Sequence, residues 1–385
     1  MSGRLYLLLI SVGALVVVGS LLWLIAPVST AADSHFEVVA SGLDNPRGLD
    51  FDSEGALYVV EAGVGGDGDC LPGPLPDTEV CFGATGPVTR VKDGEQERVV
   101  EGLPSLSDPE GGGSFAFGPH DISTFRDRIF VAIGLDNTVA ARKQLGDEGE
   151  DLARLFRLRG NGKLQSVADL AAYEEANNPD DGQTSDGQPE LRSNPNSILA
   201  FFSGMWVVDS GCNSLLRVRH DGAISTLAAF PTRPVEFPLG SGATIPMQAV
   251  PTAVAQGPDD ALYVGELTGF PFPERQARIY RVVRGEEPEV FREGFTHIIG
   301  LEFDQEGNLY VLQIANTSLL SVFGPPFELA TGSLIRISPD GIDTVLASEG
   351  LIMPTGLTIG PDGELYVSNC GVCADKGEVA RITEP

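Results

Sequence analysis

The sequence predicts an all-β fold, a six-bladed β-propeller of four-stranded blades in which the N-terminal strand closes the last blade. Three observations lead to this prediction. A phrase built around a bulky–aromatic–aliphatic triplet occurs six times, each copy carries the signals of paired strands, and the sixth copy stops one strand short. A repeat unit that cannot bury its own faces must stack against its neighbours, and six such units favour a closed ring.

The triplets mark the second strand of each blade. Their aromatic residues are 72, 76, 57, 47 and 56 positions apart, and the shortest interval falls in the range of ~40–50 residues that is typical of a four-stranded blade. The longer intervals require insertions in loops. The triplets are Leu57–Val59, Ile129–Val131, Met205–Val207, Leu262–Val264, Leu309–Val311 and Leu365–Val367.

Further strand and turn signals surround each triplet. An apolar or alternating run before it predicts the first strand, and a Gly- or Asp-containing segment such as Asp52–Gly55 predicts the tight turn between the two. In most copies a third strand with a recurrent arginine follows, as in Thr89–Val91, and a fourth ends in a phrase such as Val99–Gly102.

The beginning of the chain supplies the strand that the sixth copy lacks. That copy runs out after its third strand, at Thr383–Pro385, whereas His35–Gly42 matches Gln96–Gly102, the fourth strand of the first copy. We therefore expect the N-terminal strand to complete the last blade. Such a clasp removes an open sheet edge that would favour aggregation.

The repeat predicts one propeller domain over residues 33–385, with a long insertion in blade 2 at about 142–193. The formal charge of −29 argues against nucleic acids and anionic membrane surfaces as partners. Residues Gly63–Gly68 match the dinucleotide-binding fingerprint, but no helix follows to hold a pyrophosphate. The sequence has neither a His-Glu-x-x-His nor a Gly-x-Ser-x-Gly motif.

Residues 1–32 are predicted to be a signal peptide or an N-terminal membrane anchor. An apolar run, Leu5–Val28, follows Arg4, and the small residues Thr30 and Ala32 suit cleavage by signal peptidase. The run is also long enough for a membrane span, which needs ~20 apolar residues. Both alternatives place the propeller outside the cytoplasm, as a secreted, periplasmic or cell-surface protein.

The five cysteines suit an oxidising compartment. Cys70 and Cys81 bracket one Gly/Pro-rich loop, and Cys370 and Cys373 form a Cys-Gly-Val-Cys sequence at the end of a predicted strand. We expect both pairs to form disulfides that staple loops. Cys212 is then left as a lone buried thiol.

Propeller geometry brings the ends of the second strands and the starts of the first strands to one mouth of the central channel. The residues three positions after each aromatic are polar in five of six copies; they are Glu61, Ile133, Asp209, Glu266, Gln313 and Asn369. The residues at the starts of the first strands are Arg47, His120, Asn196, Thr252, His297 and Thr355.

These positions supply the candidate site. The ligand-binding candidates are Arg47, Glu61, His120, Asn196, Asp209, Glu266, Gln313 and Asn369. Converging carboxylates raise one another's pKa unless Arg47, a protonated His120 or a bound cation neutralises them. Calcium prefers such oxygen ligands, and its candidate ligands are Glu61, Asp209, Glu266 and Asn369. Alternatively, these polar strand ends hydrogen-bond the backbone of neighbouring loops.

Three segments carry a resemblance to a known family: Val250–Pro273, Asp169–Pro179 and Asp209–Arg217. They resemble the scytonemin-associated ScyD/ScyE family of NHL-type propellers, and the resemblance covers about residues 35 to 385. It implies an exported bacterial six-bladed propeller, and it implies no agreed catalytic role. Related six-bladed folds include calcium-dependent lactonases, whose ligand pattern is partly echoed here.

Two functions follow from these observations. The first is a non-catalytic extracytoplasmic protein that binds a small molecule, glycan or protein at the polar channel mouth. The second is a calcium-dependent hydrolase or lactonase with His120 as a candidate general base. Whether the chain is an enzyme stays open, and the only cofactor considered is calcium. We expect a monomer whose sole membrane contact would be a retained N-terminal anchor.

Overall fold

The computed structural model describes residues 29–30, 35–74, 78–160, 162–183, 187–323 and 328–383. The predicted signal peptide or anchor falls almost wholly outside these residues. Within them, no helix has the length and apolar character needed to cross a membrane.

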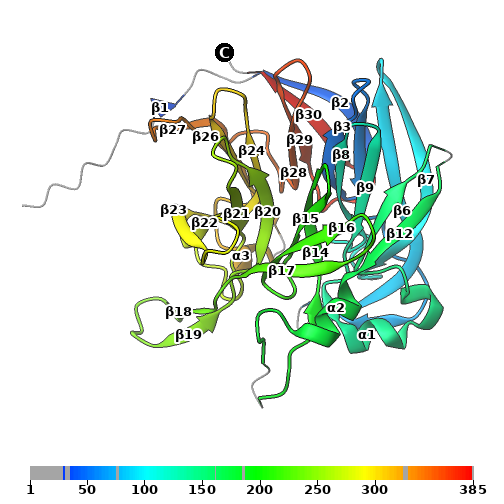
Figure 1. Ribbon diagram of the computed structural model, residues 1–385, viewed down its shortest axis with the longest axis horizontal. Coiled ribbons are helices and arrows are strands. Elements are labelled where there is room, and N and C mark those ends of the chain that lie inside the picture. The colour runs from blue at the N-terminus through cyan, green and yellow to red at the C-terminus, as the bar shows by residue number, and fades with distance from the viewer. Residues whose placement is uncertain are drawn as a thin grey trace, which may run out of the picture.

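The structure is a six-bladed β-propeller, which confirms the predicted fold class (Figure 1). Each blade is a sheet whose four core strands pair antiparallel with their sequence neighbours, except where β2 closes the last blade. The innermost strands are β3, β8, β14, β20, β24 and β28. Each contacts the next, and β28 contacts β3, which closes the ring around the channel.

Blades 1 to 3 follow the chain in order. Blade 1 contains β3 (Pro46–Phe51), β4 (Leu57–Glu61), β6 (Glu79–Lys92) and β7 (Glu95–Ser107), with β5 (Cys70–Pro72) paired to β6. Blade 2 contains β8 (Pro119–Phe125), β9 (Arg128–Ile133), β11 (Arg154–Leu158) and β12 (Leu164–Asp169). Blade 3 contains β14 (Pro195–Phe201), β15 (Gly204–Asp209), β16 (Ser214–Arg219) and β17 (Ile224–Ala229).

Blades 4 to 6 complete the ring. Blade 4 contains β20 (Pro251–Gln256), β21 (Leu262–Glu266), β22 (Ala277–Val282) and β23 (Glu289–Phe295). Blade 5 contains β24 (Ile298–Phe303), β25 (Leu309–Gln313), β26 (Ser333–Ile337) and β27 (Asp343–Ala347), with β1 (Ser29–Thr30) parallel to β27. Blade 6 contains β28 (Gly356–Ile359), β29 (Leu365–Asn369), β30 (Gly377–Thr383) and β2 (His35–Leu43).

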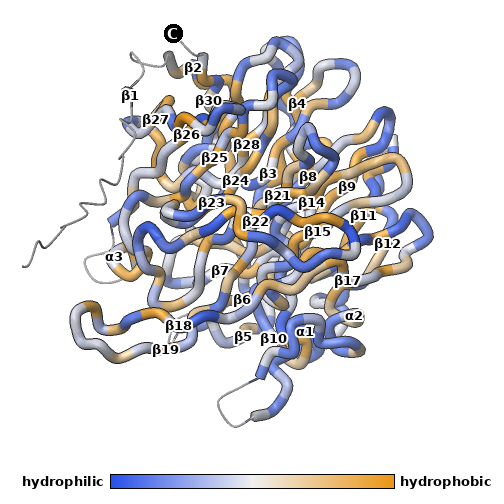
Figure 2. The backbone as a smooth tube through the Cα atoms, turned by 60° about the vertical axis from the view of Figure 1, so that its left-hand side comes forward, coloured by the Kyte–Doolittle hydropathy of each residue, from blue (hydrophilic) through white to orange (hydrophobic). Residues whose placement is uncertain are grey.

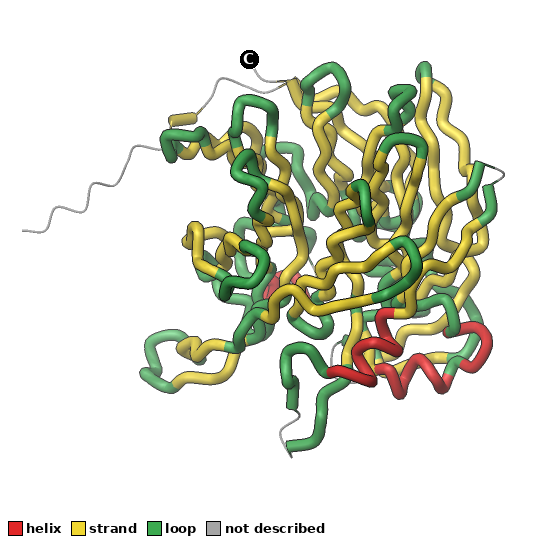
Figure 3. The backbone as a smooth tube through the Cα atoms, in the orientation of Figure 1, coloured by secondary structure: helices red, strands yellow, loops and turns green. Residues whose placement is uncertain are grey.

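The remaining elements lie in loops. Two short antiparallel pairs are β10 (Asn137–Thr138) with β13 (Arg192–Ser193) and β18 (Arg233–Glu236) with β19 (Thr244–Met247). The helices are α1 (Val139–Gln144), the 3-10 helix η1 (Gly146–Gly149), α2 (Leu170–Asn177) and α3 (Leu319–Phe323). Figure 3 shows α1 and α2 together at one end of the molecule, whereas the blades are built from strands.

The predicted insertion at about 142–193 is not one segment. Residues 154–169 inside it form β11 and β12, the third and fourth strands of blade 2. The sequence does carry a signal for this, because Phe156-Arg157-Leu158 repeats the arginine phrase of the other third strands. The extra structure therefore lies on both sides of this strand pair, in α1 and η1 before it and in α2 and the following loop after it.

The triplets form the core of every blade. Their last residues are fully buried at 0% exposure; they are Val59, Val131, Val207, Val264, Val311 and Val367. Successive side chains of a strand point to opposite faces of the sheet, so each blade packs against both of its neighbours. Figure 2 shows apolar residues along the strands and polar residues in most turns.

The N-terminal strand closes the ring as predicted. Strand β2 pairs antiparallel with β30, from His35 opposite Thr383 to Leu43 opposite Gly377. Hydrogen bonds also join blade 6 to blade 1; for example, the Asn45 N–H donates to the Cys373 carbonyl at 2.9 Å, and Thr355 Oγ1 donates to the Pro46 carbonyl at 2.6 Å.

Candidate functional site at the channel mouth

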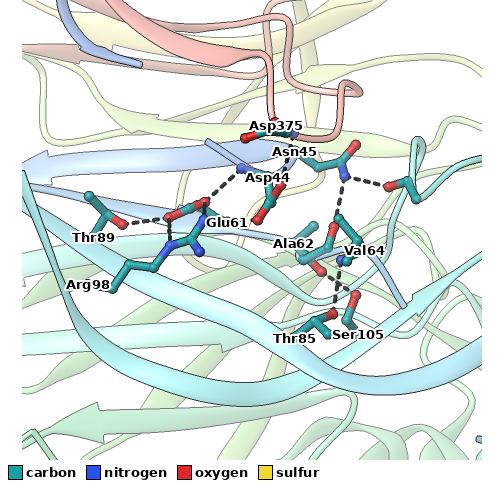
Figure 4. A network of polar contacts seen from close by, with 12 residues as sticks. Asp44, Asn45, Glu61, Ala62, Val64, Thr85, Thr89, Arg98, Ser105 and Asp375 are labelled. Atoms are coloured by element: carbon teal, nitrogen blue, oxygen red, sulfur yellow. Dashed lines mark hydrogen bonds and ion pairs between the residues drawn. The ribbon is translucent and has the colours of Figure 1, made fainter. Parts of the chain in front are cut away.

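Glu61, at the end of β4, is occupied by hydrogen bonds within its own blade (Figure 4). Its carboxylate accepts from Thr89 Oγ1 at 2.5 Å, from Arg98 Nη2 at 2.7 Å and from the Asp44 N–H at 2.7 Å. Asp44 lies just before β3, so Glu61 anchors the segment that leads into the innermost strand.

Asp209 performs the same task in blade 3. Its fully buried carboxylate accepts from the Asn194 N–H and from Ser193 Oγ, both at 2.7 Å, and from the Gly211 N–H at 3.0 Å. Burial raises its pKa, and these hydrogen bonds oppose the rise. Asn194 again directly precedes the innermost strand of the blade.

Gln313 and Asn369 anchor blades 5 and 6 in the same way. Gln313 Oε1 accepts from the Thr296 N–H at 2.6 Å, and Asn369 Oδ1 accepts from the Ile352 N–H at 2.7 Å. Glu266 differs, because its buried carboxylate is held by Arg233 Nη1 at 2.8 Å and by the Tyr280 hydroxyl at 3.3 Å. These five side chains therefore have structural partners, which matches the alternative that polar strand ends bond their neighbouring loops.

The expected convergence of Glu61, Asp209 and Glu266 is not found. In the described part of the chain, no group of three or more His, Cys, Asp and Glu side chains lies close enough to hold a metal ion. Each carboxylate turns instead toward backbone, hydroxyl or arginine donors of its own blade. The candidate calcium ligands thus do not fit a shared ion, because their oxygens already accept hydrogen bonds. These residues are Glu61, Asp209, Glu266 and Asn369.

The residues at the starts of the innermost strands divide into two groups. Thr252 and Thr355 join neighbouring blades, since their hydroxyls donate to the carbonyls of Ile298 and Pro46 at 2.6 Å. His297 lies one position before β24 and is fully buried, with Nδ1 2.7 Å from the Leu267 carbonyl. The strand pairing shows why it differs, because Ile298, and not His297, is paired with Gln313 at the end of the second strand. The buried Nε2 of His297 has no hydrogen-bond partner among the described residues.

Arg47, His120 and Asn196 also keep side-chain atoms that no described residue bonds, and these three share one position in consecutive blades. They are the second residues of β3, β8 and β14, the innermost strands of three consecutive blades. Arg47 Nη2 donates to the Ala116 carbonyl at 2.7 Å, but its buried Nε has no partner. Asn196 is half-buried, and its side chain forms no hydrogen bond to any residue that the structure describes.

His120 is held as a neutral ring. Burial, and then the charge of Arg47, lowers its pKa to about 3. Its Nδ1 lies 3.3 Å from the Pro195 carbonyl, and a carbonyl can only accept, so Nδ1 carries the proton and Nε2 is an acceptor. A pKa this low makes His120 a poor general base near neutral pH, where an efficient base has a pKa close to the working pH.

Arg47 is a cation without an anionic partner. Burial alone lowers its pKa to about 10. Its guanidinium forms no ion pair with any acidic residue in the described ranges. By contrast, the buried Arg142 pairs with Asp169 and the largely buried Arg233 pairs with Glu266.

A carboxylate cluster that the strand ends do not reveal lies on the innermost strands, with Asp121 directly after His120 and with Asp50 and Glu302 farther along their strands. Asp50 on β3 accepts from the Thr124 N–H at 2.6 Å, and Asp121 on β8 accepts from the Ile198 N–H at 2.7 Å. Glu302 on β24 accepts no hydrogen bond from the described residues. Burial raises the pKa of these groups to about 6, 7 and 8, and the Asp50 and Asp121 charges add to the rise at Glu302.

Two members of the cluster accept hydrogen bonds from backbone N–H groups at the unpaired edges of the innermost strands. Innermost strands have one unpaired edge, and Asp50 and Asp121 each accept an N–H from the next blade across that edge. Gly48 makes room for this arrangement, because a Cβ at this position would lie 1.8 Å from Asp121 Oδ1. The available signal was an acidic residue within an otherwise apolar strand, as in Gly48–Phe51 and Gly300–Phe303.

The cysteines pair as expected. Cys70 is bonded to Cys81 and Cys370 to Cys373, and Cys212 is a free buried thiol. The Cys370–Cys373 loop lies near the mouth, because the Val372 carbonyl accepts from the Phe115 N–H at 3.3 Å, next to the Ala116 carbonyl that binds Arg47. Both disulfides indicate an oxidising environment.

Neither a family model nor a curated protein matches this sequence. Similar solved structures include a gluconolactonase from Xanthomonas campestris, with 10% identity, a TM-score of 0.51 and coverage of 92% of both chains. Another is the calcium-binding protein regucalcin from Agrobacterium tumefaciens, with 14% identity, a TM-score of 0.51 and coverage of 94% of this chain and 96% of that one.

A third similar structure is a protein of unknown function from Bacteroides thetaiotaomicron, with 10% identity, a TM-score of 0.53 and coverage of 92% of this chain and 75% of the other. Identities this low show a shared fold and carry no activity across. The resemblance to the ScyD/ScyE family stays a sequence-based expectation. What the comparisons show is that this chain has the fold of six-bladed propeller proteins.

Proposed function

We propose that this protein is an exported β-propeller that binds a small molecule at the mouth of its central channel, on the innermost strands of blades 1 to 3. One observation carries the proposal. Arg47, His120 and Asn196 occupy equivalent positions and keep polar atoms that no described residue satisfies. Unpaired polar groups in a partly buried site cost free energy, and a bound ligand or water recovers it.

The degree of burial favours a small ligand over a protein or a long glycan. His120 is only 7% exposed, and Arg47 and Asn196 are half-buried. A protein partner would contact a broad exposed surface, whereas small ligands are held in concave sites by a few convergent polar groups. Export is supported by the two disulfides and by the apolar N-terminal run of the sequence.

The hydrolase alternative has weaker support. Its calcium ligands, Glu61, Asp209, Glu266 and Asn369, already have structural partners in four different blades, and its base, His120, has a pKa of about 3. We therefore derive no catalytic step from them.

A thermal-shift screen tests the proposal. A panel of small acids, amines, sugars and amides is applied to the wild type, to Asn196→Leu and to Gln256→Ala. Gln256 is the matched control, because it is an amide on an innermost strand but lies exposed at the opposite end of β20. We expect ligands that raise the melting temperature of the wild type and of Gln256→Ala to act about tenfold more weakly on Asn196→Leu. If every stabilising ligand acts equally on all three proteins, the site lies elsewhere.

A further inference from the structure

At the channel mouth, the guanidinium of Arg47 has an Nε–H donor without a hydrogen-bond partner. Several arginines have a buried Nε without a hydrogen bond. Arg154 and Arg381 form ion pairs, and Arg217 stacks on Phe201 and Trp206. Among the residues that the structure describes, the Arg47 side chain bonds only the Ala116 carbonyl. A desolvated guanidinium with free N–H donors is suited to a carboxylate or another oxyanion, which it can bind through two parallel hydrogen bonds.

The neighbouring residue restricts which oxyanion fits. His120 presents the lone pair of Nε2, because its Nδ1 proton is directed at the Pro195 carbonyl. The sulfate dianion offers only acceptor oxygens, which would face this lone pair without a hydrogen bond. A ligand that carries a hydroxyl or amide donor next to its anionic group satisfies both residues. Asn196 on the following blade can donate and accept, so it tolerates either kind of group.

The channel beyond the mouth disfavours a second negative charge. Asp50 lies three residues after Arg47 on the same strand, a separation of roughly 10 Å. Asp121 and Glu302 lie close enough to Asp50 for their charges to interact with it. A ligand with two anionic ends would bring one of them toward these carboxyl groups, whereas a monoanion would keep its only charge at Arg47.

We infer that the ligand is a small monoanionic carboxylate with a hydroxyl or amide donor beside the carboxylate, bound by Arg47 through its charge and by His120 Nε2 through that donor. This inference rests on the proposed binding function and names the chemistry of its ligand. Arg47 selects the anion, His120 selects the donor, and Asp50, whose pKa of about 6 leaves it mostly ionised at pH 7, disfavours a second anionic end.

Ligand-observed NMR titrations at pH 7 and constant ionic strength test the inference, with glycolate and acetate observed directly and sulfate, which has no protons, added as a competitor of glycolate. We expect millimolar binding of glycolate, about tenfold weaker binding of acetate, which lacks the hydroxyl, and weaker binding still of sulfate. Arg47→Gln should reduce glycolate binding at least tenfold. His120→Phe should lower glycolate to the level of acetate and leave acetate unchanged.

Arg157→Gln is the matched control. Arg157 also has a buried Nε without a hydrogen bond and a lowered pKa, but it lies on β11, the third strand of its blade. Its substitution should leave glycolate binding unchanged. Arg47→Lys provides a second variant if Arg47→Gln does not fold, and it should bind with intermediate affinity because it keeps the charge but loses the planar donors.

The outcomes separate the two proposals. Glycolate binding that survives Arg47→Gln, or sulfate binding as tight as glycolate, overturns the ligand assignment. If glycolate does not bind but other ligands from the screen lose affinity on Asn196→Leu, the mouth binds a different chemical class and the proposed function stands. If glycolate does not bind and no ligand of the screen loses affinity on Asn196→Leu, both proposals fail.

Discussion

At the scale of single residues, the same kinds of side chain have different roles according to which atoms the fold leaves free. Glu61 is fully buried, yet its oxygens accept from a hydroxyl, an arginine and a backbone N–H. Glu302 is only half-buried, but it has no hydrogen-bond donor among the described residues and lies near two other carboxyl groups. A buried carboxylate without donors favours its protonated form, so Glu302 makes the folded state sensitive to pH.

Stability should fall as pH rises from about 6.5 to 8.5. In this range Asp121, with a pKa of about 7, and Glu302 and Glu174, each with a pKa of about 8, lose protons in the folded protein. The unfolded chain has already lost them, because an ordinary carboxyl titrates near pH ~4. The folded state thus binds more protons, and its free energy of unfolding decreases with pH. His120 is neutral in the folded protein, but in the unfolded chain it titrates near pH ~6.5, so it opposes the decrease only at the lower end of this range.

Glu302→Gln should weaken this pH dependence. The amide carries no charge, so the variant should gain stability relative to wild type at pH 8.5 and little at pH 6.5, a difference of roughly 2 °C in melting temperature. Thermal denaturation at pH 6.5, 7.5 and 8.5 measures this difference. Glu306→Gln, in the exposed turn of the same blade, is the control and should follow the wild type. Equal slopes for wild type and Glu302→Gln would contradict the assignment.

At the scale of elements, β2 shows how an end of the chain stabilises a ring. It gives blade 6 its fourth strand and buries Ala40 and Leu43 at 4% and 0% exposure, whereas Val38 on the same strand is 53% exposed. Without it, β30 would present an unpaired edge. The clasp is therefore held by one face of β2 as well as by its hydrogen bonds to β30.

Leu43→Ala should lower the free energy of unfolding by about 2–5 kcal/mol, the usual range for truncating a buried leucine. Val38→Ala removes a mostly exposed side chain of the same strand and should change it by no more than about 0.5 kcal/mol. Chemical denaturation of the two variants gives both values. If both substitutions have the same small effect, β2 does not contribute to closing the ring as described.

The elements also show what the sequence could predict. The triplets are short, strongly apolar and bounded by turn residues, so their strands and their number could be read directly. The closing strand could be found because it repeats the fourth strand of the first blade. The strand pair β11–β12 was missed because helical segments flank it, although Gly160 and Gly162 mark the turn between its two strands.

The candidate site could be predicted only in part. Arg47, His120 and Asn196 could be located by their place at the start of first strands. The sequence does not show which of their atoms stay without a hydrogen bond. The partners of Glu61 and Asp209 come from loops and outer strands such as β7, which supplies Arg98. A comparison of strand ends could not find the carboxylate cluster, because Asp50, Asp121 and Glu302 lie inside first strands. In addition, Asp121 occupies a different repeat position from the other two residues.

At the scale of the whole molecule, the ring gives the channel two chemically different regions. The mouth over blades 1 to 3 presents a cation, a neutral acceptor and an amide, whereas the strands beyond it present three carboxyl groups. Innermost strands from several blades are needed to build either region, which explains why neither is visible as a contiguous sequence motif. We expect ligands to bind where polar side-chain atoms lack hydrogen-bond partners, and not at the strand ends whose side chains already bond neighbouring residues.

Hydrogen–deuterium exchange with mass spectrometry tests this claim most directly, with the most strongly stabilising ligand of the thermal-shift screen. We predict that the ligand slows exchange in peptides that cover the starts of β3, β8 and β14, around Arg47, His120 and Asn196. Peptides from the turns at the opposite end of the channel, such as 304–308, should exchange at the same rate with and without ligand. Protection confined to those turns, or to blades 4 to 6, would contradict the account.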